Sequence, residues 1–305
     1  MNDVHRGTDR AQAQEGASPR RRGRDVPGKT IVITGASDGI GAAAARQLVA
    51  DGHVVALVGR SPSKTRALAQ ELGADHFLAD FTRLSDVRAL ATQLLAAYPR
   101  IDVLANNAGG IFGDRARTAD GFEKTLQVNH LAPFLLTNLL METLVASQAS
   151  ILNTSSIGAR LFGKIDLDDL GNDRKFSPNK AYGDSKLANI LFARELDRRY
   201  RSSGIAAVAF HPGNVRTNFA SDTTSFMRWV YRTPVSSLVG LVSPGKGAET
   251  LTWLAEGAPG RDWEPGEYYE KKRPARTSRQ AADAQLAHDL WEKSAELVGL
   301  PPTVR

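Results

Sequence analysis

The sequence has no cysteine among its 305 residues. This absence excludes a disulfide framework, a thiol nucleophile and a cysteine-ligated metal site. It also has no apolar run near the ~18–20 residues that a transmembrane helix needs. The polar N-terminus carries Arg20–Arg22 without a following apolar segment, so we expect neither a secretory leader nor a membrane anchor. These absences fit a cytoplasmic protein, which is the location we expect.

Positive charge is only slightly in excess over negative charge. The formal net charge is +6 and the isoelectric point is about 9.6, which raises the question of a nucleic-acid partner. Arginines outnumber acidic residues in the polar stretch 1–26, which we expect to be a disordered basic tail. The remaining excess is dispersed among acidic residues, without a basic stripe interleaved with aromatics. We therefore expect no nucleic-acid partner.

From Lys29 onward, short apolar runs alternate with helical patterns. Buried parallel strands are typically short and rich in β-branched residues, whereas amphipathic helices repeat apolar positions every three to four residues. The pattern predicts strands at 31–33, 53–58, 76–78, 101–105, 150–154, 205–210 and 266–269. It predicts helices at 42–50, 64–72, 85–97, 126–145, 181–200, 245–254 and 281–298. This alternation predicts one α/β domain over 27–305, a Rossmann-like doubly wound parallel sheet with helices on both faces.

A glycine-rich turn follows the first predicted strand and opens the first predicted helix. Gly35, Gly39 and Gly41 would let the backbone bend sharply and approach a pyrophosphate. The N-terminus of the next helix would add free N–H groups and the positive end of the helix dipole. A dinucleotide site is the favoured interpretation, and an ordinary tight strand-to-helix turn is the alternative.

The second predicted strand ends in Gly59 and Arg60, without the acidic residue that would bind the ribose 2′-hydroxyl of NAD. Arg60 could bind a 2′-phosphate instead, which favours NADP; a solvent-facing loop arginine is the alternative. After the fourth strand, Asn106–Gly109 offers amides and small residues at a strand end, where they could line a cofactor groove or form a simple turn.

Tyr182 and Lys186 are four residues apart in a predicted helix, so they share one face. An ammonium near a phenol lowers the pKa of the phenol and makes it a usable general acid or base near neutral pH. Taken alone, this short pattern also fits a surface tyrosine beside a solvated lysine.

Taken together, these motifs resemble those of the short-chain dehydrogenase/reductase superfamily, from about Lys29 to the C-terminus. The matching pieces occur in the family order: Thr34-Gly35-x-x-x-Gly39-x-Gly41, Asp80, Asn106–Gly109, Asn129, Ser155-Ser156, Tyr182-x-x-x-Lys186 and Pro212-Gly213. Each piece is short, but their joint occurrence in matching contexts is specific. The patterns at 128–134, 185–189 and 211–217 are similar to the branch of retinol dehydrogenase-like and WW-domain oxidoreductase-like proteins.

The resemblance implies a role for each matching residue. Tyr182 would exchange a proton with the substrate oxygen, Ser156 would bind that oxygen, Lys186 would bind the nicotinamide ribose, and Asn129 would support a proton-relay water. Ser155 competes for the serine role, but the family serine is the second of such a pair. The expected cofactor contacts are Gly35, Ser37, Asp38, Gly39, Ile40, Gly41, Arg60, Asp80, Phe81, Asn107, Ala108, Gly109, Tyr182, Lys186, Val215 and Thr217.

Residues 162–180 form an insert that makes the Ser156–Tyr182 separation longer than is common in the family. Its four aspartates, Asp166, Asp168, Asp169 and Asp173, suggest a solvated acidic loop, and we expect no metal site. His130 and His211 adjoin motif residues but have no evident nucleophile to activate, so packing roles are favoured for both.

We therefore expect an NADP(H)-dependent oxidoreductase, preferring NADPH to NADH, that interconverts a carbonyl and an alcohol on a small-to-medium hydrophobic substrate. The variable apolar segment 220–242 is expected to cover the substrate, with a partner or membrane surface as its alternative. The family resemblance also implies a homodimer or homotetramer. Two other functions stay open: a non-catalytic NADP-binding sensor or scaffold, and a dehydratase or epimerase that regenerates its cofactor in each cycle.

Overall fold

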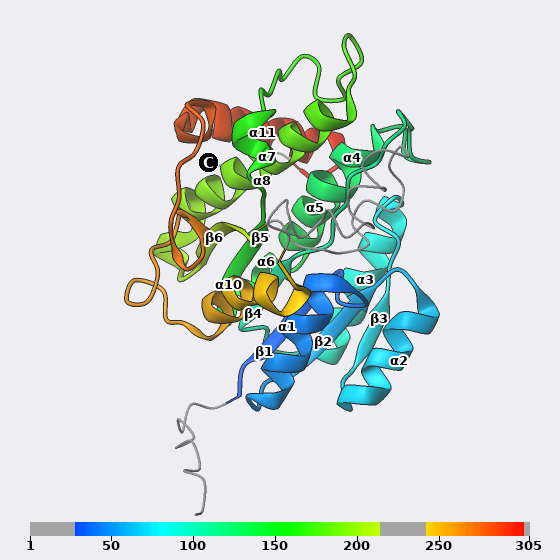
Figure 1. Ribbon diagram of the computed structural model, residues 1–305, viewed down its shortest axis with the longest axis vertical. Coiled ribbons are helices and arrows are strands. Elements are labelled where there is room, and N and C mark those ends of the chain that lie inside the picture. Colours follow the sequence, from blue (N-terminus) through cyan, green and yellow to red (C-terminus); the bar gives the residue numbers. More distant parts are fainter. Residues whose placement is uncertain (1–27, 214–241, 302–305) are drawn as a thin grey trace, which may run out of the picture.

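The computed structural model describes residues 28–213 and 242–301 (Figure 1). Its sheet has eight strands in the order β3-β2-β1-β4-β5-β6-β7-β8, and all neighbours are parallel except β7 and β8. The strands are β1 Thr30–Thr34, β2 Val54–Gly59, β3 His76–Leu78, β4 Val103–Asn106, β5 Ser150–Thr154, β6 Ala206–His211, β7 Tyr268–Glu270 and β8 Arg273–Pro274. The predicted doubly wound α/β fold is confirmed.

Helices cover both faces of this sheet (Figure 1). In β1, Ile31 and Ile33 point to the face under α1 and α10, while Val32 points to the opposite face, as the two-residue period of a strand requires. The helices are α1 Gly39–Ala50, α2 Pro62–Leu72, α3 Leu84–Ala97, α4 Lys124–Leu126, α5 Ala132–Leu139, α6 Met141–Ala146, α7 Gly158–Leu161, α8 Pro178–Tyr200, α10 Pro244–Glu256 and α11 Ala284–Leu297. No helix in these two described ranges is long and apolar enough to cross a membrane.

The helical stretch predicted over 126–145 is confirmed, but it is not one regular α-helix. The structure divides this stretch into α4, a π-helical segment η1 (Gln127–Leu131), α5 and α6. Pro133 has no N–H to donate to the carbonyl of Asn129, so a regular α-helix is interrupted at this point. The interruption leaves Asn129 in the π-helical segment, a geometry that often marks functional sites.

Other differences lie at element ends. Helix α2 begins two residues before its predicted start because Ser61 caps it and Pro62 occupies its first turn. The strand predicted at 266–269 is β7, which begins at Tyr268 rather than at Gly266, whose φ is 81°. A short 3₁₀ turn, η5 (Gln280–Ala282), precedes α11, and another, η2 (Arg201–Ser203), follows α8.

Several sequence predictions lie outside the described residues. The tail at 1–26, the cofactor contacts Val215 and Thr217, and the substrate-covering segment 220–242 except for Val242 belong to this group.

The C-terminal helix α11 is anchored in an aromatic cluster. Trp291 lies 5.0 Å from Phe134 of α5 and 5.7 Å from Phe192 of α8, measured between ring centroids. Phe134 is fully buried, and its ring also lies 5.2 Å from that of Phe192. This cluster joins three helices on the face of the sheet that carries α8.

We expect Phe134→Ala to lower the free energy of unfolding by ~3–5 kcal/mol, since it removes a buried aromatic ring and leaves a cavity. Leu95→Ala, on the 41 %-exposed side chain of α3, is the control and should cost less than ~1 kcal/mol. Urea denaturation followed by circular dichroism measures both. Equal costs for the two variants would contradict this account of the core.

Candidate active site

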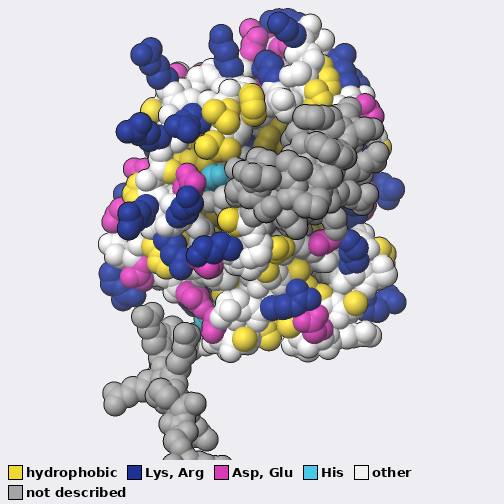
Figure 2. All heavy atoms as spheres, viewed as in Figure 1, with side chains coloured by type: hydrophobic (Ala, Val, Ile, Leu, Met, Phe, Trp, Pro, Cys, Tyr) yellow, Lys and Arg dark blue, Asp and Glu magenta, His cyan; other side chains and the backbone are white. Residues whose placement is uncertain are grey.

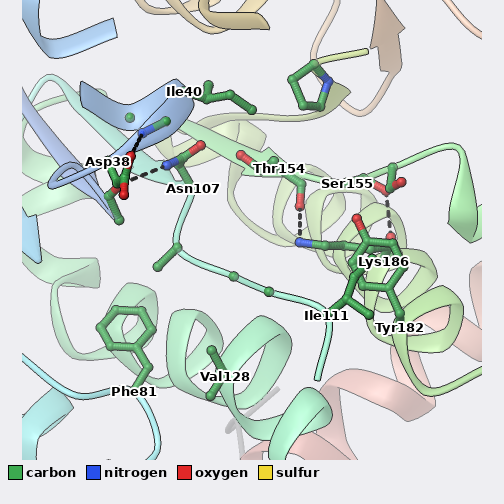
Figure 3. Close-up of a pocket in the computed structure, with 18 of the residues that line it drawn as sticks. Asp38, Ile40, Phe81, Asn107, Ile111, Val128, Thr154, Ser155, Tyr182 and Lys186 are labelled. Carbon is green, nitrogen blue, oxygen red and sulfur yellow. Dashed lines mark hydrogen bonds between the residues drawn. The ribbon is translucent and has the colours of Figure 1, made fainter. Parts of the chain in front are cut away.

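A cavity of about 620 Å³ lies at the carboxyl ends of the central strands. The strand order reverses between β1 and β4, and doubly wound sheets bind ligands in the crevice at such a point. Figure 3 places the Asp38–Ile40 turn on one side of this hollow and Tyr182 with Lys186 on the other. The predicted site residues that line it are Gly35, Ser37, Asp38, Gly39, Ile40, Gly41, Arg60, Asp80, Phe81, Asn107, Ala108, Gly109, Ser156, Tyr182 and Lys186.

The glycine turn is held against the end of β4. Gly35 has a φ of 67°, and a Cβ there would lie 2.8 Å from the Cα of Ala108, so only glycine fits. The Asn107 side-chain amide donates to the Thr34 carbonyl at 2.9 Å, and the backbone N–H groups of Asn107 and Ala108 each donate to Thr34 Oγ1 at 3.0 Å. Asn106–Gly109 therefore fixes the turn and also lines the cavity.

Two cations lie where β2 meets α2. Arg60 follows Gly59, at which any Cβ would clash with Thr65 Oγ1, and Lys64 lies in the first turn of α2. Lys64 lines the cavity and forms an ion pair with Asp38, with Nζ 2.7 Å from Oδ2. Sequence reasoning missed Lys64. The sequence signal that could have identified Lys64 is Ser61-Pro62, a typical start of a helix. A helix that begins there places Lys64 in its first turn, beside the end of β2.

Asp38 has a second contact besides Lys64. Its Oδ1 accepts a hydrogen bond from the Gly39 N–H at 2.7 Å, so the carboxylate lies at the N-terminus of α1. The side chain of Asp80, another predicted cofactor contact, accepts from the Thr82 backbone and hydroxyl at 3.0 and 2.9 Å. Both aspartates thus already hold backbone in place at the cavity edge.

Ser156 and Tyr182 meet at the other end of the cavity. A Cβ placed on Gly158 would lie 3.0 Å from Tyr182 Cε1 and 3.5 Å from Ser156 Oγ, so both side chains surround this glycine. Ser156 Oγ accepts from the Gly158 N–H at 3.1 Å. The hydroxyl and the phenol therefore face the same small space.

Lys186 lies one helical turn after Tyr182 on α8 and is only 1 % exposed. Its Nζ donates to the Thr154 carbonyl at 3.1 Å and lies 5.7 Å from the centroid of the Tyr182 ring (Figure 3). Burial lowers the pKa of Lys186 from 10.5 to about 7. A small change in its surroundings would therefore change its charge near neutral pH.

The two adjacent serines have different contacts. Ser155 Oγ donates to the Lys186 carbonyl at 2.7 Å, which ties β5 to α8, as the dashed line in Figure 3 shows. Both serines line the cavity, and Ser156 Oγ has its hydrogen bond with the Gly158 N–H instead. The assignment of Ser156 rather than Ser155 to the substrate oxygen stays a prediction.

Asn129 does not line the cavity. Its side chain is fully buried, accepts from the Gly110 N–H at 2.9 Å and donates to the Gly110 carbonyl and Ser185 Oγ at 3.0 Å. Asn129 is nevertheless close to the lysine, since a Cβ on Gly109 would lie 2.9 Å from Asn129 Oδ1 and 3.1 Å from Lys186 Nζ.

The remaining cavity wall is largely apolar and was not identified from the sequence. Ile111 and Phe112, after β4, and the 46 %-exposed Phe162, after α7, are among its apolar residues. Asn179 and His211 add polar groups. Burial lowers the pKa of His211, so its imidazole is neutral at pH 7.

His130 has a packing role. It is buried, and its Nε2 lies 2.9 Å from Ser294 Oγ of α11. Burial lowers the pKa of His130 to about 4, which keeps it uncharged at neutral pH.

The acidic insert is held by ion pairs. Asp173 pairs with Arg115 and Arg117, and Asp166 with Arg174. No cluster of three or more metal-ligating side chains occurs within 28–213 and 242–301.

Known proteins resemble this chain over most of its length. The family model described as short chain dehydrogenase matches residues 29–228. A Streptomyces protein named "Putative daunorubicin C-13 ketoreductase DnrU" is 46 % identical over 90 % of this chain and 94 % of its own length. Human retinol dehydrogenase 13 is 37 % identical, with 95 % of this chain and 90 % of that protein covered.

Solved structures agree. A crystal structure of an uncharacterized protein from Mycobacterium paratuberculosis superposes with a TM-score of 0.72 at 32 % identity, covering 92 % of this chain and 98 % of that one. A short-chain dehydrogenase from Sphingobium yanoikuyae in complex with NADPH gives 0.58 at 26 % identity, covering 73 % and 82 %. The motifs, the sheet and these relatives lead to one conclusion: the chain belongs to the short-chain dehydrogenase/reductase family, is related to the retinol dehydrogenases and a ketoreductase, and is an oxidoreductase that acts on CH–OH groups.

Proposed function

We propose that the protein is an NADP(H)-dependent reductase or dehydrogenase that interconverts a carbonyl and an alcohol on a hydrophobic substrate of small to medium size. The observation that carries this proposal is the convergence of Tyr182, Ser156 and Lys186 at one end of a cavity whose other end is a glycine turn flanked by Arg60 and Lys64. A nicotinamide nucleotide bound along this cavity would supply the hydride.

The residues at the tyrosine end have separable tasks. Tyr182 gives a proton to the substrate oxygen during reduction and removes it during oxidation, while the Ser156 hydroxyl donates a second hydrogen bond to that oxygen. Two donors aimed at an oxygen that becomes an alkoxide lower the barrier to its formation. Lys186, held by the Thr154 carbonyl, favours the ionised phenol when protonated.

Asn129 is proposed to support the proton relay from its place in the π-helical segment. In a regular α-helix the N–H of residue 133 would donate a hydrogen bond to the Asn129 carbonyl. Pro133 has no N–H and cannot make this bond. The carbonyl is thereby suited to hold a water near Lys186, in line with the role implied by the family.

The preference for NADPH follows from charge at the end of β2. Arg60 and Lys64 offer two cations to a 2′-phosphate, and no carboxylate follows β2 to bind a 2′-hydroxyl. Asp38 opposes this preference through its negative charge, but its ion pair with Lys64 reduces that effect. The NADPH complex of the Sphingobium relative gives further support.

The apolar wall of Ile111, Phe112 and Phe162 supports a hydrophobic substrate. The names of the relatives, a daunorubicin ketoreductase and retinol dehydrogenases, point in the same direction.

Segment 220–242 is proposed to cover the substrate. The domain is proposed to span 27–305 after a disordered tail. We further expect a cytoplasmic homodimer or homotetramer. Light scattering would measure the mass of this oligomer.

Tyr182→Phe should lower kcat by at least ~100-fold because the proton donor is lost, with the dissociation constant for NADPH nearly unchanged. Tyr200→Phe, near the end of the same helix, is the matched control and should keep full activity. Stopped-flow absorbance with a panel of aryl and alkyl ketones measures turnover, and fluorescence titration measures cofactor binding. Turnover retained in Tyr182→Phe, or no turnover of any carbonyl by the wild type, would refute the assignment; the latter would favour a sensor.

Arg60→Ala and Lys64→Ala should each weaken NADPH binding by ~10-fold or more, since each removes a charge-assisted contact with the 2′-phosphate, and should leave NADH binding unchanged. Arg66→Ala, an exposed arginine on the same helix, is the control. Calorimetric titration with both cofactors measures the ratio of the dissociation constants for NADH and NADPH. The phosphate role is wrong if NADH binds wild type as tightly as NADPH and the ratio does not change in the variants.

Lys186→Met should change the pH dependence of stability. Between pH 7 and 10.5 the unfolded chain keeps the Lys186 proton that the folded chain has lost, so the free energy of unfolding contributed by this residue rises with pH. Below pH 7 the folded chain must bury the charge. The stability gain of Lys186→Met over wild type should therefore be largest below pH 7 and shrink as pH rises.

Urea denaturation at pH 6 and pH 9, without cofactor, tests this sign. Lys175→Met, an exposed lysine in the insert, is the control and should show no such pH dependence. A gain that grows with pH would contradict the burial account of Lys186.

A further inference from the structure

A second cavity of about 310 Å³ adjoins the active site and shares Ser156 and Ile157 with its wall. We call it the basic pocket. It lies between the α7–α8 region and the β7–β8 hairpin, and its other lining residues are Ala159, Arg160, Ile190, Tyr268, Glu270, Lys271, Arg273, Pro274, Ala275, Arg276 and Thr277. Ser156 and Ile157 therefore border both cavities.

The floor of the basic pocket is buried and mainly apolar. Ala159, Ile190 and Tyr268 are 2 %, 1 % and 4 % exposed. Burial, with further contributions from Glu270 and Tyr182, raises the pKa of the Tyr268 phenol, so this ring stays neutral and lies near the proposed proton donor. This floor suits the carbon skeleton of a substrate rather than a hydrated ion.

The rim has the opposite character. Arg160, Lys271, Arg273 and Arg276 are all exposed and face a single carboxylate, Glu270, whose Oε1 is 4.0 Å from Lys271 Nζ. Within the described ranges, no ion pair or side-chain hydrogen bond is found for the three arginines. Figure 2 shows Lys and Arg side chains along the left flank, where Figure 1 draws the β7–β8 segment in orange.

The turn that carries part of this rim is conformationally strained. Lys271 and Lys272 connect β7 to β8 with φ of 51° and 62°, values that favour glycine or asparagine. Both central residues of a two-residue hairpin turn commonly have a positive φ, and here Lys271 lines the pocket.

We propose that the basic pocket binds an anionic oxygen group, a carboxylate or a phosphate monoester, at the far end of the carbonyl or alcohol substrate. This inference rests on the proposed function and narrows its substrate to amphiphilic molecules. The reacting carbon lies at Ser156 and Tyr182, the apolar body crosses the floor beside Ile190 and Tyr268, and the anion meets the arginines. Guanidinium groups bind both anions through paired, charge-assisted hydrogen bonds.

The kinetic test compares three ketones of similar length: benzoylbutyrate, its methyl ester and benzoylpropyl phosphate. Wild type should reduce the ketone of benzoylbutyrate with a kcat/KM at least about tenfold above that for the methyl ester, mainly through a lower KM. The double variant Arg273→Gln/Arg276→Gln should abolish this preference and keep the rate on the ester. A larger preference for the phosphate, lost in the same variant, identifies phosphate as the anion.

Lys272→Gln is the matched control, because it removes one charge from the same turn at a residue that does not line the pocket. The proposal would be overturned if wild type reduced the ketone of the methyl ester with the same kcat/KM as the ketone of benzoylbutyrate. An equal loss of preference in Lys272→Gln would also overturn it, since that result indicates the general surface charge rather than the pocket.

A binding measurement separates this proposal from the proposed function. Phenylbutyrate, which has no ketone to reduce, is titrated calorimetrically into the full chain and into the double arginine variant. Arginine-dependent binding without turnover of any ketone would support the pocket and refute the reductase. Turnover of every ketone with no phenylbutyrate binding would support the reductase and refute the pocket.

Discussion

The buried ammonium of Lys186 is the constraint on which the site depends. An amino group that is 1 % exposed requires hydrogen-bond acceptors, and the carbonyl of Thr154 at the end of β5 supplies one. Ser155 holds the same helix through the Lys186 carbonyl. These contacts fix α8 against the sheet, and they thereby fix the position of Tyr182 one turn away.

The fold could be predicted because each local pattern agreed with the whole. Apolar runs such as Ile31-Val32-Ile33 are too short for helices, and the intervening segments carry helical periodicity, so a parallel sheet was the consistent solution. The break before α5 was missed because periodicity continues across it. The missing N–H of Pro133 was the local signal, and it is easily outweighed by apolar neighbours.

The site was predictable to the extent that it lies in contiguous motifs. The glycine turn and the Tyr182–Lys186 pair each lie on one element, so spacing alone placed their members together. Lys64 was missed because its proximity to the cavity depends on where α2 begins, and element ends are the least certain part of a sequence interpretation. Phe162 and Arg276 could not be assigned, because they reach the two cavities through irregular segments without a period.

The attachment of α11 has a consequence for biosynthesis. Its Trp291 completes the aromatic cluster, and its Ser294 meets His130 in the π-helical segment that also contains Asn129. A nascent chain on the ribosome can pair its first strands early, but this support arrives only after α11 has been translated. The π-helical segment therefore acquires its final packing long after its own residues have been translated, and a chain interrupted before α11 would have the glycine turn without this support.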